Sequence, residues 1–513
     1  MRGSFLLKHP ARNWGCEQPT LEKVIYKKFI YSSVILLSIL LVASTALVDI
    51  SKARASIKDE KLKWTACGSG GQCARLIVPL DDTISGGPTI KLALARVKAR
   101  DPEKRIGALV VNPGGPGAPG AQFALDFAAS LPEVIQDRFD IVGFDPRGTG
   151  KSAGVDCTDD FDSIYALDWA PDTEFARTQL EEGFRNLANA CSKSDGDKLP
   201  FLSTRRAARD LDLIRAALGE KRLTYLGYSY GSYLGAQYAN QYPDRVRALV
   251  LDGAVDPSLD SQSLQVQQSE AFENSLNLFL QDCSESTDCA FHKNGESASA
   301  YDKIRTQVGE IPLTVNDGEK RKLNGTLFDI GVSQILYEGE DGWATLASAL
   351  AAADEGDGAE LLFYSDLYTG RLGKGSYDNL TESFFGVGCI DGPDVGGIEG
   401  IRRIESAAAA AAPRLGRSIV NNSLVCAFWP VAAEPLVALP AQTNKPILVI
   451  GTRNDPATPL AWAEGLTKEL GNAVLVTTEG ARHTAYASGK GCVDNLVNRY
   501  LISTKAPKIG TKC

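Results

Sequence analysis

The residues Gly227-Tyr228-Ser229-Tyr230-Gly231 fit the pattern Gly-x-Ser-x-Gly between a β-rich run and a helical run. In that context the pattern is typical of a nucleophile elbow, a tight turn that lifts a serine hydroxyl above the end of a sheet. The flanking positions are glycines because side chains would not fit in so tight a turn. We therefore predict that Ser229 is a nucleophile and that the amide N–H of Tyr230 belongs to an oxyanion hole. The alternative is a Gly-Ser turn that precedes a core helix by chance.

A serine hydroxyl needs a base near neutral pH, normally a histidine. The chain has three histidines, His9, His292 and His483. His9 lies in the N-terminal segment, and His292 lies in the polar stretch "CAFHKNG", which favours a solvated loop residue. His483 directly follows the last strand-like run, so we predict that it is the base.

An acid should orient the imidazole ring of His483. Asp455 in "PILVIGTRNDPATP" lies between Ser229 and His483 in the chain, just beyond a strand-like run. Active-site loops of open α/β sheets gather at such carboxyl ends, and α/β-hydrolases carry their triad in the order Ser, acid, His. Asp455 is therefore the predicted third member. The alternative is a turn aspartate before Pro456.

The stretch "GFDPRGTGKS" at 143–152 ends like a nucleotide-binding phosphate loop. The loop pattern requires a glycine at the position of Asp145, and a carboxylate there would repel a phosphate. We therefore reject an ATPase or GTPase. Asp145 and Arg147 are predicted to brace the carboxyl edge of the sheet by pairing with neighbouring loops.

A second glycine-rich stretch, "NPGGPGAPG" at 112–120, formally fits a dinucleotide-binding fingerprint. Pro116 and Pro119 remove two backbone donors from this loop, which argues against an NAD-dependent oxidoreductase. The loop instead follows the third strand-like run, the place from which hydrolases take their second oxyanion amide. Gly115 is the preferred donor and Gly114 the alternative, because Pro116 has no N–H.

The candidate catalytic residues must be positioned by a sheet that has helices on both faces. Short β-rich runs alternate with helical stretches from about residue 73, which is typical of a mostly parallel sheet. The rhythm stops after Pro257, and alanine-rich helical segments follow until strand-like runs resume at 446–450 and 473–477. We predict an α/β-hydrolase core over 56–259 and 436–513, interrupted by a mainly helical cap over 260–435. The strand-like runs of the first part are 74–79, 89–97, 106–111, 139–144, 223–227 and 246–251.

The N-terminal segment, residues 1–55, has the pattern of an export signal. A basic stretch precedes a mainly apolar run at 29–48, and Ala53-Arg54-Ala55 suits a signal peptidase. The predicted location is therefore secreted or periplasmic. The alternative is an uncleaved signal anchor that keeps the protein on a membrane. The formal net charge of −9 without basic clusters argues against nucleic-acid binding.

Cysteine usage agrees with an oxidising compartment. Of eleven cysteines, Cys16 precedes the apolar run, and the others form an even set. The chain has no Cys-x-x-Cys and few histidines, so a zinc site is disfavoured and no metal is predicted. Pairing of neighbours along the chain is the simplest disulfide pattern: Cys67 with Cys73, Cys157 with Cys191, Cys283 with Cys289, Cys389 with Cys426 and Cys492 with Cys513.

As an ordered set, "NPGGPG", "GFDPRGTGKS", "GYSYG", "VLDGAVDP", "GTRNDPATP" and "ARHTAY" resemble the secreted tripeptidyl aminopeptidases and the proline iminopeptidase branch of the α/β-hydrolases. The resemblance covers most of residues 65–513. It implies a serine exopeptidase that releases short peptides, tripeptides above all, from free N-termini, with Ser229, Asp455 and His483 as triad. The resemblance implies that the protein needs no cofactor and that its partners are peptide substrates. A stable membrane partner would require that the N-terminal segment is retained as an anchor.

The resemblance also implies that an acid of the cap binds the substrate's α-ammonium group. Asp391 in "GVGCIDGPD" matches that position, and a structural role beside Cys389 is the alternative. Weaker candidates lie in "YEGEDGW": Glu338, Glu340 and Asp341. Pro113 replaces the histidine of the His-Gly-Gly-Pro-Gly motif of proline iminopeptidases, which argues against strict proline specificity. The rival functions are an esterase or small-molecule amide or lactone hydrolase with the same triad, and a non-catalytic exported binding protein.

Overall fold

The computed structural model describes residues 62–513 except 69, 317, 435–436 and 490. The predicted export segment and Cys16 lie outside the described residues. Apart from Thr83–Gly86, the described residues form one compact unit.

Nine strands form the central sheet in the order β1-β2-β3-β5-β4-β6-β7-β12-β13. The strands from β5 to β13 pair in parallel, whereas β1, β2 and β3 are antiparallel at one edge. Each strand-like run of the sequence forms a strand, so the prediction of a mostly parallel sheet is confirmed, and the short β1 is an addition. The bounds are β1 Thr65–Cys67, β2 Gly71–Pro79, β3 Thr89–Val97, β4 Gly107–Asn112, β5 Phe139–Phe144, β6 Leu223–Tyr228, β7 Val246–Asp252, β12 Ile447–Thr452 and β13 Ala473–Thr478.

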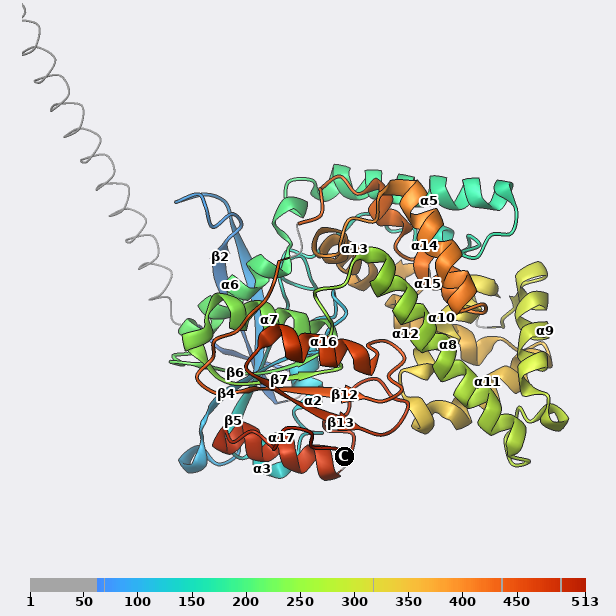
Figure 1. Cartoon of the computed structure of the whole chain (residues 1–513). Coiled ribbons are helices and arrows are strands. Elements are labelled where there is room, and N and C mark those ends of the chain that lie inside the picture. The colour runs from blue at the N-terminus through green and yellow to red at the C-terminus, as the bar shows by residue number, and fades with distance from the viewer. Residues whose placement is uncertain (1–61, 69, 317, 435–436, 490) are drawn as a thin grey trace, which may run out of the picture. The chain divides into compact units, whose positions relative to one another are not determined.

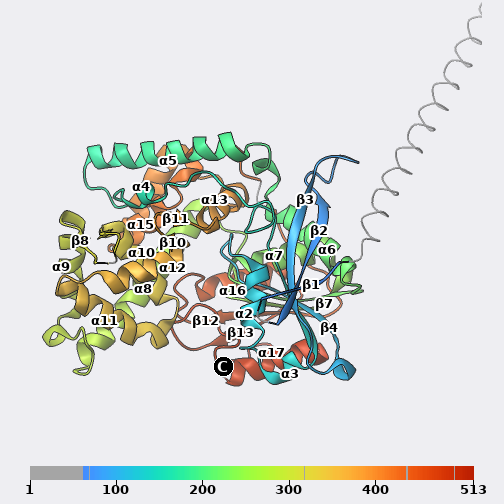
Figure 2. The same cartoon turned by 180° about the vertical axis from the view of Figure 1, so that it is seen from behind.

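Helices cover both faces of the sheet (Figures 1 and 2). Their apolar sides bury two clusters, one on each face, which explains why the central strands β4, β5, β6 and β12 are buried throughout. One face is covered by α6 (Thr204–Ala217), α7 (Tyr230–Gln241) and α16 (Leu460–Leu470), the other by α2 (Gly120–Phe127), α3 (Glu133–Gln136) and α17 (Gly491–Ser503). Short 3-10 helices η1 (Pro102–Lys104) and η3 (Pro243–Arg245) lie in connections of this core.

A helical region is inserted between β7 and β12, two strands that are neighbours in the sheet. Figure 1 shows its helices gathered at one side of the sheet. They are α8 (Ser261–Glu285), α9 (Ser297–Glu310), α10 (Gly325–Leu336), α11 (Trp343–Asp354), α12 (Ala359–Thr369), α13 (Leu380–Asp391), α14 (Gly397–Ala411) and α15 (Gly416–Asn421), with η4 (Lys293–Gly295), η5 (Gly339–Gly342) and η6 (Leu424–Phe428). Two small hairpins join them, β8 (Leu313–Thr314) with β9 (Lys322–Leu323) and β10 (Arg371–Gly373) with β11 (Ser376–Tyr377). The predicted limits of this cap, 260 and 435, remain a prediction.

A segment from the first half of the chain packs with the cap. It holds α4 (Asp162–Tyr165), α5 (Glu174–Asp195) and η2 (Leu199–Phe201). Leu180, Phe184 and Leu187 of α5 share a buried cluster with residues of α13, α14 and η6, and both figures show α5 beside these cap helices. The helical region is therefore built from two separate segments of the chain, the one that holds α4, α5 and η2 and the insertion between β7 and β12.

All five predicted disulfides are present. Cys157–Cys191 ties α5 to the loop after β5, and Cys389–Cys426 ties α13 to η6. Cys67–Cys73, Cys283–Cys289 and Cys492–Cys513 complete the set. None of the helices in the described part of the chain combines the length and apolar composition needed to cross a membrane.

The turn after β5 braces the sheet, as predicted. Arg147 is 2% exposed, and its guanidinium donates two hydrogen bonds of 2.8 Å to the carboxylate of Asp210 in α6. The same guanidinium donates to the carbonyl oxygens of Leu80 and Phe201 at 2.9 Å each. The carboxylate of Asp145, also 2% exposed, accepts two backbone N–H groups at 2.9 Å.

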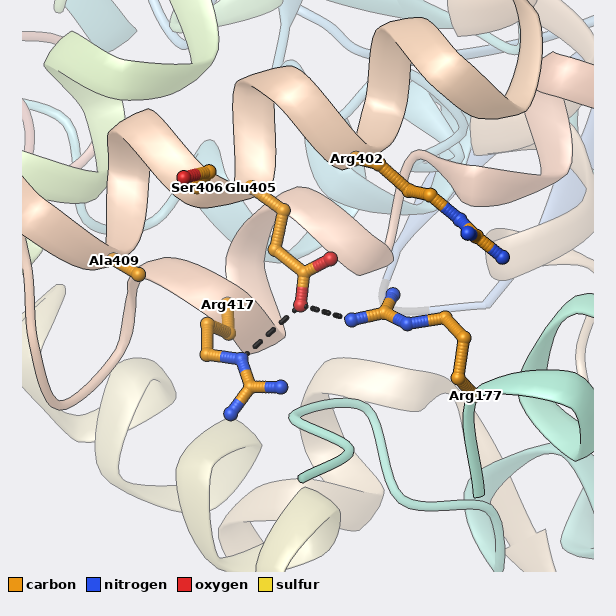
Figure 3. A pocket seen from close by; sticks show the side chains of 6 residues that line it. All are labelled: Arg177, Arg402, Glu405, Ser406, Ala409 and Arg417. Atoms are coloured by element: carbon orange, nitrogen blue, oxygen red, sulfur yellow. Dashed lines mark hydrogen bonds and ion pairs between the residues drawn. The ribbon is translucent and has the colours of Figure 1, made fainter. Parts of the chain in front are cut away.

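Glu405 of α14 lies in a small pocket between α5, α14 and α15 (Figure 3). One of its carboxylate oxygens accepts from Arg177 Nη2 of α5 at 2.6 Å and from Arg417 Nε of α15 at 3.1 Å. Glu405 is 5% exposed, so its charge depends on these two arginines. The figure shows Arg402 pointing away from Glu405. Its guanidinium donates instead to Glu181 of α5 at 2.8 Å. The arginines of this pocket are thus already paired with acids of the cap and of α5.

We expect Glu405→Gln to lower the free energy of unfolding by about 1–3 kcal/mol, because two largely buried guanidinium groups lose their shared counter-charge. Urea denaturation of wild type and variant measures the difference. Glu181→Gln is the matched control, since it breaks a more exposed pair with Arg402 and should cost about 0–1 kcal/mol. Equal losses in the two variants would contradict the structural role of Glu405.

Candidate active site

Ser229 occupies a tight turn between β6 and α7. Its φ of 54° and ψ of −124° are unusual for a residue with a side chain, and such strain is found at functional sites. Its backbone N–H donates to the carbonyl of Asp252 at 2.8 Å. A Cβ on Gly231 would lie 2.7 Å from the Asn112 side-chain oxygen, so this position excludes other residues. The structure therefore has the elbow geometry that the motif predicts.

The predicted acid and base meet at the ends of two neighbouring strands. Asp455 follows β12 and His483 follows β13. The imidazole Nδ1 lies 2.8 Å and 3.0 Å from the two carboxylate oxygens of Asp455, which is 1% exposed. This contact places the Nδ1 proton toward the carboxylate and leaves Nε2 to accept a proton.

Asp455 is itself held by the turn that follows it. Its carboxylate accepts the backbone N–H groups of Ala457 at 2.9 Å and Thr458 at 2.8 Å, and the Thr458 hydroxyl at 3.1 Å. The same hydroxyl lies 3.3 Å from His483 Nδ1. Thr458 was not predicted from the sequence, although an Asp with a Thr three residues later is a local signal for such a side-chain turn.

The cap contributes to the position of His483. The carbonyl of Tyr337, at the end of α10, accepts the backbone N–H of His483 at 2.9 Å. The two rings meet edge to face, with centroids 5.2 Å apart. His483 Nε2 is buried and has no hydrogen-bond partner among the described residues. The imidazole of His483 is therefore held on its Nδ1 side, and its Nε2 is free to accept a proton.

Ser229 and His483 both lie against the end of β7. The Ser229 N–H bonds to Asp252, and a Cβ on the next residue, Gly253, would lie 3.0 Å from the His483 ring carbon Cε1. The hydroxyl and Nε2 are not hydrogen-bonded to each other in the described arrangement. In unliganded sites such contacts are often loose and tighten when substrate binds.

Asp252 is a second buried acid beside the predicted triad. Its carboxylate accepts the backbone N–H groups of Ala485 at 3.0 Å and Tyr486 at 2.7 Å, in the loop that carries His483. Burial raises the pKa of Asp252 to about 6, although these two hydrogen bonds oppose the shift. Sequence reasoning missed this residue because its partners lie more than 200 positions away.

The two candidate oxyanion amides of the glycine loop differ in the structure. The Gly114 N–H donates to the Asn112 side chain at 3.0 Å, and a Cβ on Gly114, whose φ is +100°, would lie 2.9 Å from Ser229 Cβ. Gly114 thus packs on the elbow. Gly115 lines the same cavity as Ser229 and Tyr230, and its N–H makes no hydrogen bond to any described residue. This geometry favours Gly115 over Gly114 as a donor.

A cavity of about 700 Å³ lies between the core and the cap. Ser229 and Thr458 line it from the core, and aromatic side chains such as Tyr165, Trp169 and Phe384 line it elsewhere. Its charged lining residues are all aspartates among the residues that the structure describes: Asp256, Asp329, Asp391 and Asp394. A cavity with this lining favours cations over anions.

Asp391, at the end of α13, lines the cavity and also caps α6. Its two oxygens accept the backbone N–H of Thr204 at 2.9 and 3.0 Å, and the Thr204 hydroxyl donates to it as well. That hydroxyl also contacts the Tyr230 hydroxyl. Burial raises the pKa of Asp391 to about 7, against the lowering effect of Thr204. Asp391 therefore caps α6 and also lines the cavity, where its carboxylate can contact a ligand.

The weaker amine-binding candidates lie elsewhere. Glu338, Glu340 and Asp341 are exposed and do not line this cavity. Asp341 pairs with Arg482 at 3.0 Å. His292 makes a local contact with the Cys283 carbonyl at 3.1 Å, in the cap.

Comparison with known proteins agrees with this geometry. The family model described as "alpha/beta hydrolase fold" matches residues 107–294, and the one described as "TAP-like protein" matches residues 412–513. Serine protease Hip1 of Mycobacterium tuberculosis is 32% identical over 96% of this chain and 98% of its own. Carboxylesterase B of the same species is 35% identical over 86% of each chain, and tripeptidyl aminopeptidase of Streptomyces lividans is 31% identical over 86% of this chain and 83% of its own. The predicted fold and family are thus confirmed, and the chain belongs to the α/β-hydrolase family that contains serine protease Hip1 and the tripeptidyl aminopeptidases.

Proposed function

We propose that the protein is a serine exopeptidase that releases short peptides, tripeptides above all, from substrates with a free N-terminus. The observation that carries this proposal is the cavity that contains both Ser229 and Asp391. A nucleophile and a carboxylate that forms no ion pair with a described residue, both in one anionic cavity, suit a peptide that enters with its ammonium group first. The names of the relatives, a serine protease and a tripeptidyl aminopeptidase, support the same reaction.

The proposed chemistry is acyl transfer. His483 Nε2 takes the proton of Ser229 as the serine oxygen attacks the scissile carbonyl, while Asp455 orients the imidazole and stabilises its charge. The amides of Gly115 and Tyr230 bind the oxyanion. His483 then gives its proton to the leaving amine and the C–N bond breaks. Water, deprotonated by His483, attacks the acyl group and releases it from Ser229.

Asp391 is the proposed group for the substrate's α-ammonium. Thr204 donates to the carboxylate from one side, and the remaining lone pairs of two carboxylate oxygens can accept an ammonium group from the cavity. An acylated N-terminus has no charge to offer, so it should bind less well.

A substrate panel tests the function. Release of a chromophore from Ala-Ala-Ala-anilide, from its N-acetylated copy and from a simple aryl ester compares the three reactions directly. We expect the free tripeptide to have the highest kcat/KM. Faster cleavage of the acetylated peptide would contradict an aminopeptidase.

An esterase is the second candidate function, because a relative that is 35% identical is named carboxylesterase B. The same triad would hydrolyse an ester, since function lies in the cleft rather than in the fold. Efficient turnover of the aryl ester without release from any of the peptides would favour this alternative.

The pH dependence of selectivity should follow Asp391. With a pKa of about 7, its carboxyl group loses its proton as the pH rises through neutrality, and only the charged form attracts an ammonium group. The peptide amine in turn loses its proton near pH 7.7–8.0. The ratio of kcat/KM for free over acetylated peptide should therefore rise from pH 6 to about 7.5 and then fall, and taking the ratio cancels the titration of His483.

Asp391→Asn is the matched variant, because the amide keeps the size of the side chain. In this variant the rise of the ratio between pH 6 and 7.5 should disappear. A ratio that keeps the wild-type profile would exclude Asp391 from amine recognition.

We propose that the protein is exported, and that it is secreted or periplasmic unless residues 1–55 stay as a membrane anchor. The five disulfides and the similarity to Hip1 support export. N-terminal sequencing of the protein from culture medium and from membranes distinguishes cleavage from anchoring.

A further inference from the structure

One face of α8 forms part of the cavity wall. The lining residues recur at helical spacing: Ser261, Leu264, Gln265, Gln268 and Phe272. Gln265 is 7% exposed, and its side-chain oxygen is buried and accepts no hydrogen bond from any residue in the described part of the chain. A buried polar atom without a hydrogen-bond partner is rare in a folded protein.

Comparable groups in the same region have partners. Gln268, one turn further along α8, donates to the carbonyl of Ala457 at 2.7 Å. The indole of Trp462 donates to Gln267 at 2.8 Å. Other buried groups of the cap without a partner among the described residues, such as Ser275 Oγ and Trp343 Nε1, do not line the cavity, so Gln265 differs from them by its place in the cavity wall.

Trp429 supplies a second group of this kind. It follows η6 and lines the same cavity from a different segment of the cap. Its indole N–H is buried and has no acceptor among the residues described by the structure. The cavity thus has an amide that can both accept and donate, and an indole that can donate.

A peptide main chain complements these groups, because each peptide unit carries one N–H donor and one carbonyl acceptor. Leaving buried groups unpaired is costly, so a ligand that pairs them binds better than one that does not. A small ester has no N–H and cannot satisfy the glutamine oxygen.

We infer that Gln265 and Trp429 form a subsite that binds the main chain of a peptide substrate on its acyl side. Gln265 binds a peptide group through its amide, and Trp429 donates its indole N–H to a peptide carbonyl. This inference rests on the proposed peptidase function and explains why such an enzyme would prefer acyl groups with several peptide bonds over single residues.

Gln265→Leu and Trp429→Phe test the subsite, because each removes the polar atoms and keeps most of the volume. For each variant we expect the ratio of kcat/KM for Ala-Ala-Ala-anilide over the aryl ester to fall about tenfold, mainly through KM. The thermal unfolding midpoint should stay equal or rise, since an unpaired polar group leaves the interior.

Gln268→Leu and Trp462→Phe are the matched controls. They break hydrogen bonds that exist in the structure, so they should lower the unfolding midpoint. If Gln265→Leu lowers the midpoint as Gln268→Leu does, or leaves the ratio unchanged, the subsite is overturned.

Binding to an inactive enzyme separates failure of the subsite from failure of the proposed function. Calorimetric titration of Ser229→Ala with Ala-Ala-Ala-anilide should show a Kd that rises about tenfold when Gln265→Leu is added. Equal Kd values overturn the subsite whether or not the wild type cleaves peptides. A tenfold difference together with a wild type that cleaves esters alone would retain the subsite and overturn the peptidase. A Ser229→Ala protein that binds no peptide overturns both.

Discussion

Replacing Ser229 by alanine is expected to lower kcat for Ala-Ala-Ala-anilide by about 10⁶-fold, the effect seen when a hydrolase loses its nucleophile. The physical reason is that no acyl-enzyme forms without the hydroxyl, while the cavity and the proposed oxyanion amides of Gly115 and Tyr230 are unchanged and should still bind substrate. KM should therefore change much less than kcat. Single-turnover and steady-state rates of the purified variant measure both quantities.

Folding and labelling controls accompany this variant. The unfolding midpoint of Ser229→Ala should match that of the wild type, because the substitution leaves the backbone hydrogen bonds of the turn to Asp252 and Ser232 in place. A fluorophosphonate probe should label the wild type and leave the variant unlabelled. Activity above about one hundredth of the wild-type rate would contradict nucleophilic catalysis by Ser229.

Replacing Arg147 by methionine is expected to lower the free energy of unfolding by about 3–5 kcal/mol, because the carboxylate of Asp210 would stay buried without its counter-charge. Both side chains are at most 3% exposed. The carbonyls of Leu80 and Phe201 would also lose a donor. Urea denaturation followed by tryptophan fluorescence measures the loss.

The double variant Arg147→Met, Asp210→Leu is the control for this second prediction. It removes both charges, so much of the lost stability should return. Arg147→Lys should not restore it, since an ammonium group cannot donate to two carboxylate oxygens and two carbonyls in the same planar geometry. Equal stabilities of Arg147→Met and the double variant would show that the unpaired carboxylate of Asp210 is not the source of the loss.

Local sequence patterns were sufficient to predict most strands of the sheet and the positions of the catalytic candidates. The strands β4, β5, β6 and β12 are buried throughout, and their apolar runs are therefore visible in the sequence. The elbow glycines and the scarcity of histidine then narrow the choice to Ser229 and His483. Asp455 follows from its place after a strand.

Contacts made by the cap could not be predicted in the same way. Tyr337 meets His483 across nearly 150 residues of chain, and Asp252 meets the loop after His483 across more than 200. Such contacts depend on how the insertion folds back on the sheet, and this arrangement cannot be predicted from the local periodicity of the sequence. The unpaired side-chain oxygen of Gln265 is likewise a result of packing, because the sequence around it is that of an ordinary amphipathic helix.

The insertion leaves the sheet at β7 and returns at β12, and these two strands pair directly through Leu448 and Val250. An insertion whose two ends lie side by side can be replaced without moving the strands that carry it. One fold can therefore acquire new specificities in evolution, or in the laboratory, by exchange of the whole cap. In this protein, however, the incoming cap must also provide a carbonyl that accepts the His483 backbone N–H and a ring that contacts the imidazole, as Tyr337 does now.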